Sequence, residues 1–220
     1  MQTRTWMVVM ALMVLALGPA RAAQEESEWV QLFDGKTTEG WHNPYDWGKA
    51  EVVNGEIHLT SEKRKWFLCT NKQYSDFILK AEIKVPEGNS GIMFRCDVKK
   101  NKVTGYQAEV DPSDRKWSGG LYDEGGRKWF ISPNRDQADS DEAAETSIKA
   151  FRDRAGDSFK PEQWNQYRIE CRGDHIKIYV NGTLCTDIHD DDEANGYIAI
   201  QHHGEDGLVY KFRNIRIKEL

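Results

Sequence analysis

The sequence predicts an all-β protein that folds as an antiparallel two-sheet jelly-roll sandwich. Its apolar residues fall in about a dozen short runs, and several of these alternate between apolar and polar positions as a half-buried strand does. Gly, Asn and Pro turns separate the runs, and the sequence has no heptad pattern, no long amphipathic helix and no internal repeat. Residues 29–220 are enough for one domain of two such sheets.

The first 23 residues are predicted to be a signal peptide. Arg4 supplies a positive charge, residues 6–17 are apolar, and residues 20–22 have the small-x-small form of a cleavage site. The apolar run is shorter than the roughly 20 residues that span a bilayer, so an uncleaved anchor is the less favoured alternative. We therefore expect a linker over 24–28 and a secreted or periplasmic protein with no membrane span after cleavage.

Before residue 112 the pattern predicts strands joined by tight turns. Asn54-Gly55 is a two-residue signal for a hairpin turn, and Pro86 ends the most regularly alternating run. The predicted strands are 29–33, 52–53, 57–60, 66–70, 77–85, 91–97 and 106–111.

Residues 130–160 depart from the strand pattern and are predicted to form a long excursion. The segment is polar and acidic, but Ala143, Ala144, Ile148 and Phe151 have a rough helical spacing. We expect one short helix there. An excursion of this length in a domain is either functional or a solvated loop.

The strand pattern resumes after the excursion and continues to the end of the chain. Asn181-Gly182 is a second hairpin signal. The predicted strands are 164–171, 175–180, 183–188, 197–201 and 208–218.

The charge balance argues against a nucleic-acid partner. The formal net charge is -6, and both signs are mixed along the sequence. A nucleic-acid binder needs a basic face to neutralise phosphates, so no such partner is expected.

The four cysteines are expected to be buried free thiols. They are Cys69, Cys96, Cys171 and Cys185, each in a predicted strand and none with CxxC spacing. A metal cluster is therefore not expected. Export would permit disulfides, which are the alternative, but a domain of this size does not depend on them.

One face of the predicted strand 106–111 carries an amide and two carboxylates. Gln107, Glu109 and Asp111 alternate with apolar residues, so they share a face with neighbours about 7 Å apart. Such a row can simply face solvent. Two acids also suggest a glycosidase, but the third position of a glucanase-type triplet is Ser113, after a proline. This weakens the case for ordinary retaining hydrolysis without excluding it.

Arg95 lies on the preceding predicted strand. If the two strands pair with their apolar faces aligned, Arg95 lies near Glu109 or Asp111 and lowers the pKa of the carboxyl beside it. A purely structural cross-strand ion pair is the alternative. The opposite face of this strand is expected to carry Ile92, Phe94 and Cys96.

A second polar group is expected at the end of the strand 197–201. Ile198 and Ile200 face one way, which leaves Gln201 and His203 on the other side. A histidine can transfer protons or bind a metal near neutral pH, although a lone surface histidine is the alternative. Gly204 indicates a tight bend beside it.

Aromatic residues form the third candidate feature. Most of the eight tryptophans lie at predicted strand ends or in loops. Sugar rings present apolar CH faces, so exposed indoles combined with carboxylates and amides suit carbohydrate binding. Trp117 and Trp129 are expected to be exposed, with Tyr122 as a further candidate, and core packing is the alternative for each.

Seven segments together carry a resemblance to a known family, and these are 32–36, 40–41, 89–95, 106–111, 164–165, 200–204 and 212–217. Taken in order, they resemble the 3-keto-disaccharide hydrolase domain family over roughly residues 29–220. The resemblance implies a concanavalin-like lectin/glucanase jelly roll in a secreted bacterial protein that cleaves glycosidic bonds of sugars oxidised to a ketone at carbon 3. The chain departs from the family pattern at His202, where an Asp is common, and in a longer excursion.

The chemistry implied by this resemblance needs one good base. A ketone at carbon 3 acidifies the proton on carbon 2, so a base can form the enolate, the group on carbon 1 leaves, and water adds back. We expect Glu109 or His203 as base, with Arg95 or a bound divalent cation as enolate stabiliser. Asp111 and Gln201 would position them. The residues expected to bind an oligosaccharide or glycoside are Asn89, Gln107, Trp117, Tyr122 and Gln201.

Two other classes of function stay open. The same fold could serve as a non-catalytic carbohydrate-binding module or as a structural domain at the cell surface. The Arg and Glu arrangement on neighbouring strands favours an enzyme over a structural domain. Nothing in the sequence separates the enzyme from the binding module.

Overall fold

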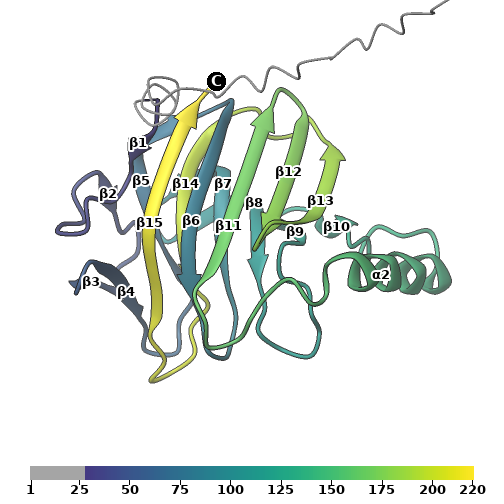
Figure 1. Cartoon of the computed structure of the whole chain (residues 1–220), viewed down its shortest axis with the longest axis horizontal. Coiled ribbons are helices and arrows are strands. Elements are labelled where there is room, and N and C mark those ends of the chain that lie inside the picture. The colour runs from purple at the N-terminus through teal and green to yellow at the C-terminus, as the bar shows by residue number, and fades with distance from the viewer. Residues whose placement is uncertain (1–27) are drawn as a thin grey trace, which may run out of the picture.

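Two antiparallel sheets pack face to face and enclose one apolar core (Figure 1). The structure is a computed structural model and describes residues 28–220. The predicted signal peptide and nearly all of the predicted linker lie outside the described residues. The architecture confirms the predicted all-β sandwich.

The first sheet has eight strands. Its order is β13-β12-β11-β6-β15-β4-β3, and β1 pairs with β15 beside this path. The strands are β1 (Val30–Gln31), β3 (Lys49–Val53), β4 (Glu56–Thr60), β6 (Phe77–Lys84), β11 (Asn165–Arg172), β12 (His175–Val180), β13 (Thr183–His189) and β15 (Tyr210–Glu219).

The second sheet has seven strands in the order β10-β9-β8-β7-β14-β5-β2. Its centre is formed by the consecutive strands β7 and β8 and by β14, which comes from a distant part of the sequence. The strands are β2 (Trp41–His42), β5 (Trp66–Tyr74), β7 (Ser90–Lys99), β8 (Lys102–Val110), β9 (Leu121–Glu124), β10 (Lys128–Ser132) and β14 (Gly196–His202).

Strand alternation places the core between the sheets. Tyr106, Ala108 and Val110 of β8 are fully buried there, as are Leu79 and Ile83 of β6. Because successive side chains point to opposite faces, the residues between them in β8 lie on the outer face of the seven-stranded sheet. The predicted division of the 106–111 segment into two faces is therefore confirmed.

Both predicted hairpin turns are present. Asn54 and Gly55 have φ values of 52° and 81°, and Asn181 and Gly182 have 49° and 85°. A two-residue turn that follows the twist of its strands needs positive φ at both central positions, which Asn and Gly tolerate best. The turns fix the register of β3 with β4 and of β12 with β13.

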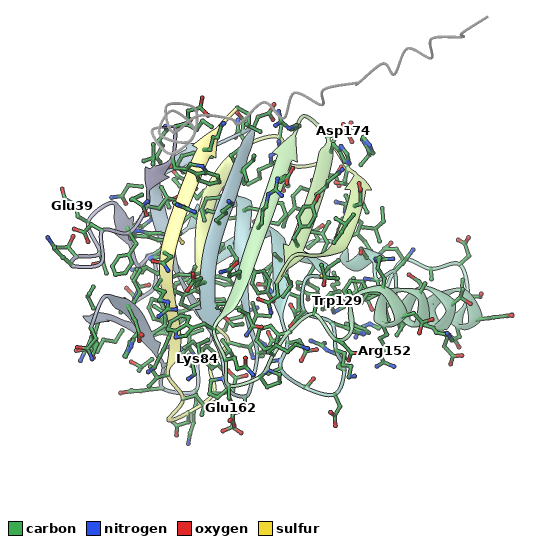
Figure 2. All side chains as sticks on the ribbon, in the orientation of Figure 1. Glu39, Lys84, Trp129, Arg152, Glu162 and Asp174 are labelled. Carbon is green, nitrogen blue, oxygen red and sulfur yellow. The ribbon has the colours of Figure 1, made fainter. Side chains whose placement is uncertain are left out.

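The predicted helix is also present, as α2 (Asp141–Ala155). The side chain of Ser140 accepts a hydrogen bond from the Ala143 N–H, which caps the first turn. Only Phe151 and Ala155 of the helix are buried, so α2 projects from the sandwich with Arg152 and other polar side chains in solvent (Figure 2).

Three short strands were not predicted. These are β2, β9 and β10, which have two, four and five residues. Runs this short do not complete enough of the two-residue period to be recognised, and β10 lies at the start of the excursion. The predicted thiols are confirmed, since all four cysteines are free and buried. No helix within residues 28–220 is long and apolar enough to cross a membrane.

A β-bulge in β7 contradicts the predicted position of Arg95. Phe94 pairs with Tyr106 but Asp97 pairs with Thr104, so Arg95 and Cys96 together oppose Gly105, and Arg95 has a φ of 48°. The bulge also moves Cys96 to the outer face, where it packs in a small apolar cluster with Met93. The predicted shared face of Ile92, Phe94 and Cys96 is therefore wrong at its last member.

Candidate functional site

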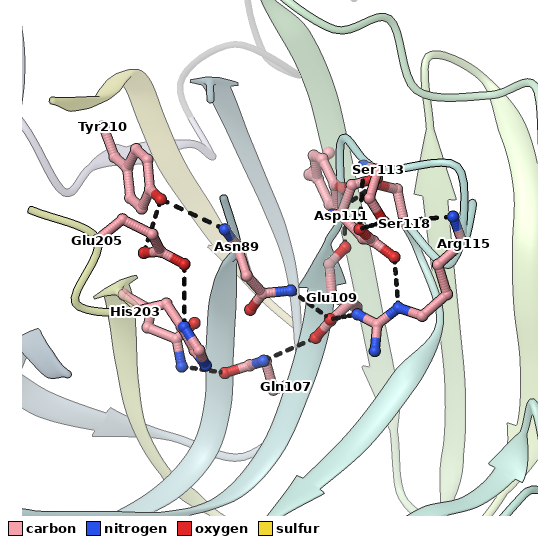
Figure 3. Close-up of polar contacts among 12 residues, drawn as sticks. Asn89, Gln107, Glu109, Asp111, Ser113, Arg115, Ser118, His203, Glu205 and Tyr210 are labelled. Atoms are coloured by element: carbon pink, nitrogen blue, oxygen red, sulfur yellow. Dashed lines mark hydrogen bonds and ion pairs between the residues drawn. The ribbon is translucent and has the colours of Figure 1, made fainter. Parts of the chain in front are cut away.

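Side chains from β8, β9, β10, β14 and the loops beside them line a cleft of about 200 Å³ on the outer face of the seven-stranded sheet. The side chains of Asn89, Gln107 and Arg115 converge on Glu109, and His203 lies across from it (Figure 3). The lining residues are Lys65, Asn89, Gln107, Glu109, Arg115, Tyr122, Glu124, Trp129, Arg135, Gln201 and His203.

Glu109 is a buried carboxylate held by three donors. Asn89 Nδ2 and Arg115 Nη2 each donate to Oε1 at 2.7 Å, and Gln107 Nε2 donates to Oε2 at 2.9 Å. Oε1 therefore uses both of its lone pairs, whereas Oε2 keeps one. Burial raises the pKa of Glu109 to about 7, although Arg115 and the two amides each act to lower it.

Arg115 connects Glu109 to Asp111. Its Nε donates to Asp111 Oδ2 at 2.6 Å, and the N–H and hydroxyl of Ser113 donate to the other oxygen at 3.1 and 2.5 Å. The Arg115 guanidinium also lies 4.7 Å from the centre of the Trp117 ring. Asp111 does not line the cleft, and it lies behind Arg115 and fixes the guanidinium beside Glu109.

Arg95 is not part of the site, which corrects the prediction. The antiparallel register pairs Gly91, not Arg95, with Glu109. The Arg95 side chain is 1% exposed, and its guanidinium donates to the Ser75 and Gly173 carbonyls and to Asp76. Arg95 therefore ties together turns at the far end of the strand, and Arg115 supplies the cation at Glu109.

Two buried amides extend the hydrogen-bond chain from Glu109 into β14. Gln201 Nε2 donates to Gln107 Oε1 at 2.9 Å, and Gln107 in turn donates to Glu109. The Gln107 side chain lies over Gly91 of the neighbouring strand, where an added Cβ would be 2.3 Å from Gln107 Cδ. Glycine at position 91 therefore leaves the space that this amide occupies.

His203 stands on the opposite wall of the cleft. Its side chain is half exposed, and Nδ1 lies 3.1 Å from Glu205 Oε1. The other Glu205 oxygen accepts a hydrogen bond from the Tyr210 hydroxyl at 2.8 Å. The Asn89 N–H donates to that same hydroxyl at 3.3 Å, so this wall connects to the residue that holds Glu109.

His202 faces away from the cleft. Its ring is buried and stacks on Tyr210 with centroids 4.3 Å apart. Its Nδ1 accepts from the Gly204 N–H at 3.1 Å. Burial lowers the pKa of His202, which favours a neutral ring that shapes the bend after β14.

The cleft brings together most of the predicted site residues. Trp117 does not line it, and Trp117 and Trp129 are each only 3% exposed, so their predicted exposure is wrong. The two indoles pack edge to face with centroids 4.6 Å apart, because the loop that carries Trp117 folds onto β10, which carries Trp129. The predicted residues that line the cleft are Asn89, Gln107, Glu109, Tyr122, Gln201 and His203.

Five polar residues of the site were missed. Arg115 follows Asp111 by four residues, in a turn where the Arg115 N–H donates to the Ser113 hydroxyl oxygen. No periodic pattern in the sequence marks Arg115. Glu124 shares a face with Tyr122 on β9, a period-two signal that prediction of this strand would have recovered. Loops supply the others, which are Lys65, Arg135 and Glu205.

The donor set does not fit a divalent cation. Arg115 already bridges the two carboxylates, Glu109 and Asp111, and amide N–H groups face Glu109. A metal ion there would meet a guanidinium and amide donors instead of oxygen ligands. No group of three or more His, Cys, Asp or Glu side chains within residues 28–220 is arranged to hold a metal.

A family model described as the 3-keto-alpha-glucoside-1,2-lyase-like domain matches residues 28–218. The chain belongs to this family. The match confirms the resemblance found in the sequence and places all of the cleft residues inside the 3-keto-alpha-glucoside-1,2-lyase-like domain. No curated protein matches the chain.

Solved structures similar to this family member share its fold. A protein from Parabacteroides distasonis ATCC 8503, provisionally assigned as a glycosyl hydrolase, is 22% identical, with 87% of this chain and 99% of that chain covered and a TM-score of 0.57. A second protein of this kind from the same organism is 17% identical, with 90% and 96% covered and a TM-score of 0.60. The carbohydrate binding module CBM66 from Bacillus subtilis is 17% identical, with 82% and 96% covered and a TM-score of 0.55. At these identities the likeness shows the fold alone, and it confirms the predicted jelly roll.

Proposed function

We propose that the protein cleaves glycosidic bonds of 3-keto sugars by removing the proton on carbon 2, eliminating the group on carbon 1 and adding water. Membership of the 3-keto-alpha-glucoside-1,2-lyase-like family supports the substrate class. We also propose that it is secreted or periplasmic, on the composition of its first 23 residues.

The observation that carries this proposal is the state of Glu109. A carboxyl with a pKa of about 7 is poised to take a proton near neutral pH, where an ordinary glutamate is a much weaker base. Only Oε2 has a lone pair left by the hydrogen bonds to Asn89, Gln107 and Arg115. We therefore assign Oε2 as the atom that removes the proton from carbon 2.

Arg115 takes the role of enolate stabiliser that the sequence suggested for Arg95. Its Nε and Nη2 groups hold the two carboxylates, and Nη1 donates to no residue of the described chain. As Glu109 becomes neutral on taking the proton, the positive charge of Arg115 is left to stabilise the negative oxygen on carbon 3.

His203 completes the reaction as the acid that donates a proton to the leaving oxygen. The enolate electrons reform the ketone and make a double bond between carbons 1 and 2, while the bond from carbon 1 to the glycosidic oxygen breaks. The protonated His203 donates its proton to that oxygen. Water then adds to carbon 1, giving its proton to His203. The proton on Glu109 exchanges with solvent after the leaving group departs, and Glu109 then gives a solvent-derived proton to carbon 2.

A non-catalytic carbohydrate-binding module is the second candidate. The likeness to CBM66 favours it, because that module has the same fold. The burial of Trp117 and Trp129 speaks against a flat aromatic platform for sugar rings. A pure binding function would also leave the raised pKa of Glu109 without a role.

The test is release of sugar from a 3-keto-glucoside and from the matched unoxidised glucoside by the purified protein, with and without a chelator. We expect release from the keto substrate only, and no effect of the chelator. Binding of either glucoside without release of sugar would support the non-catalytic binding module. Release from the unoxidised glucoside would contradict the proton-abstraction route.

A further inference from the structure

Glu205 holds His203 without itself lining the cleft. Its two oxygens have different partners, with Oε1 3.1 Å from His203 Nδ1 and Oε2 accepting from the Tyr210 hydroxyl at 2.8 Å. Burial alone would raise the pKa of Glu205, but the bonds from His203 and Tyr210 outweigh burial and lower the pKa. The carboxylate is therefore ionised at neutral pH and can only accept hydrogen bonds.

The fold fixes Glu205, on the side away from His203, through its hydrogen bond with Tyr210. Tyr210 lies on β15 in the other sheet, is fully buried and stacks on His202. Gly88 leaves room for the pair, because an added Cβ would lie 2.1 Å from the Tyr210 hydroxyl oxygen and 2.9 Å from Glu205 Cδ. The Glu205 carboxylate thus has an anchor that does not depend on the exposed His203 ring.

An ionised Glu205 determines where His203 carries its proton. Because Oε1 can only accept, Nδ1 must be the protonated nitrogen of the neutral ring, which leaves Nε2 as the one that titrates. The carboxylate also stabilises the imidazolium. Other charged or titratable side chains lie on the elements around His203, and these are Lys65, Glu109, Glu124 and Arg135 in the cleft and His202 beside it in the chain.

We propose that Glu205 is a positioning residue that fixes the Nδ1–H tautomer of His203 and stabilises its protonated form as the acid for the leaving oxygen. The part of this proposal that names the leaving oxygen as proton acceptor rests on the proposed function. The part that assigns the His203 tautomer does not. Glu205 touches neither the substrate nor the reacting atoms.

The kinetic test compares Glu205→Gln with wild type on two 3-keto-glucosides, one with a sugar leaving group and one with a nitrophenol leaving group. The nitrophenolate leaves without an acid, whereas a sugar alkoxide needs one. We expect kcat to fall about 10- to 100-fold for the sugar leaving group and to change little for nitrophenol. Glu205→Asp should restore part of the loss. Equal losses on both substrates would overturn the proposal.

The matched control is Tyr210→Phe, which removes the anchor but keeps the Glu205 charge. Tyr210→Phe should lower kcat for the sugar leaving group less than Glu205→Gln does. The loss should again be larger for the sugar leaving group than for nitrophenol. If Tyr210→Phe reproduces the Glu205→Gln pattern in full, the charge is not the cause and the proposal fails.

A measurement without substrate separates this proposal from the proposed function. Nitrogen-15 NMR of the wild-type histidines at high pH should show His203 protonated at Nδ1, and Glu205→Gln should weaken this preference for the Nδ1–H tautomer. An Nε2–H tautomer in wild type would contradict the role of Glu205 even if 3-keto-glucosides are cleaved. An Nδ1–H tautomer with no cleavage would sink the proposed function and leave the positioning intact.

Discussion

The outer faces of the two sheets carry similar residues but put them in different surroundings. On the seven-stranded sheet, Gln107, Glu109 and Gln201 are each at most 3% exposed. On the eight-stranded sheet, Arg213 donates to Glu82 at 2.7 Å with side chains 36% and 18% exposed. Both faces arise from the same alternation of polar and apolar residues. The difference comes from the loops that cover one face and leave the other open to water.

This difference decides what each charged pair can do. A pair near the surface is screened by water and typically contributes about 1 kcal/mol or less. A pair under loops pays a desolvation penalty, so removing one partner leaves a buried charge that is strongly unfavourable. The proposed reaction therefore assigns a role to the Glu109 and Arg115 pair and none to the Glu82 and Arg213 pair.

The largest predicted effect comes from removing Arg115, whose side chain is 34% exposed but holds two carboxylates that are only 3% and 2% exposed. Arg115→Met leaves Glu109 and Asp111 without their shared cation and should lower the free energy of unfolding by about 3–5 kcal/mol. Arg213→Met is the matched control, because it also removes one carboxylate partner and an aromatic contact, here with Trp164 at 4.0 Å. Urea unfolding should show about 1 kcal/mol or less for the control. Equal losses would contradict the comparison.

The second prediction concerns the pH dependence of stability. The pKa of Glu109 is raised from 4.5 to about 7 on folding, so the folded state binds more protons than the unfolded state between these values. Stability from this group is therefore fully present below about pH 4.5 and lost as pH rises towards 7. Glu109→Gln should match wild type at pH 4 and exceed its stability by about 3 kcal/mol at pH 8.

Glu82→Gln on the other sheet is the control for that experiment. Its carboxylate is partly exposed, so its effect on unfolding should be about 1 kcal/mol or less at both pH values. The stability difference between Glu109→Gln and wild type should be larger at pH 8 than at pH 4. An equal difference at both pH values would mean that folding does not raise the pKa of Glu109.

The smallest predicted effect tests one amide. Gln107→Leu removes the donor to Glu109 Oε2, which stabilises the charged form, so the pKa of Glu109 should rise further. The acidic limb of the kcat/KM profile should move to higher pH. Gln166→Leu, an exposed amide on β11, should leave the profile unchanged. A profile that moves to lower pH in Gln107→Leu would count against Glu109 as the base.

Sequence reasoning recovered the faces of the strands better than the loops. Alternation was enough to group Gln107 with Glu109 and Gln201 with His203, because a regular strand has a fixed period. It failed at Arg95, where the bulge adds one residue and reverses the pattern. No pattern in one sequence indicates where such an insertion will occur.

The contacts made by the loops could not be predicted from the sequence for a different reason. Arg115 reaches Glu109 only because the turn after Asp111 folds back through Ser113, and the loop residue Trp117 is buried where it packs against Trp129 of β10. These are tertiary contacts made by a loop, and no periodic pattern in the sequence marks them. Polarity and proximity in sequence suggested a carbohydrate site, but not the residue that supplies its cation.

The central claim is that Glu109 removes the proton from carbon 2 of a 3-keto sugar. Its most direct test is to follow a 3-keto-glucoside by NMR in deuterium oxide with wild type, with Glu109→Gln and without enzyme. Wild type should release sugar that carries deuterium at carbon 2 at early times, and Glu109→Gln should lose both release and labelling by about 100-fold or more. Release by wild type without deuterium at carbon 2, or release by Glu109→Gln within about tenfold of wild type, would contradict the account.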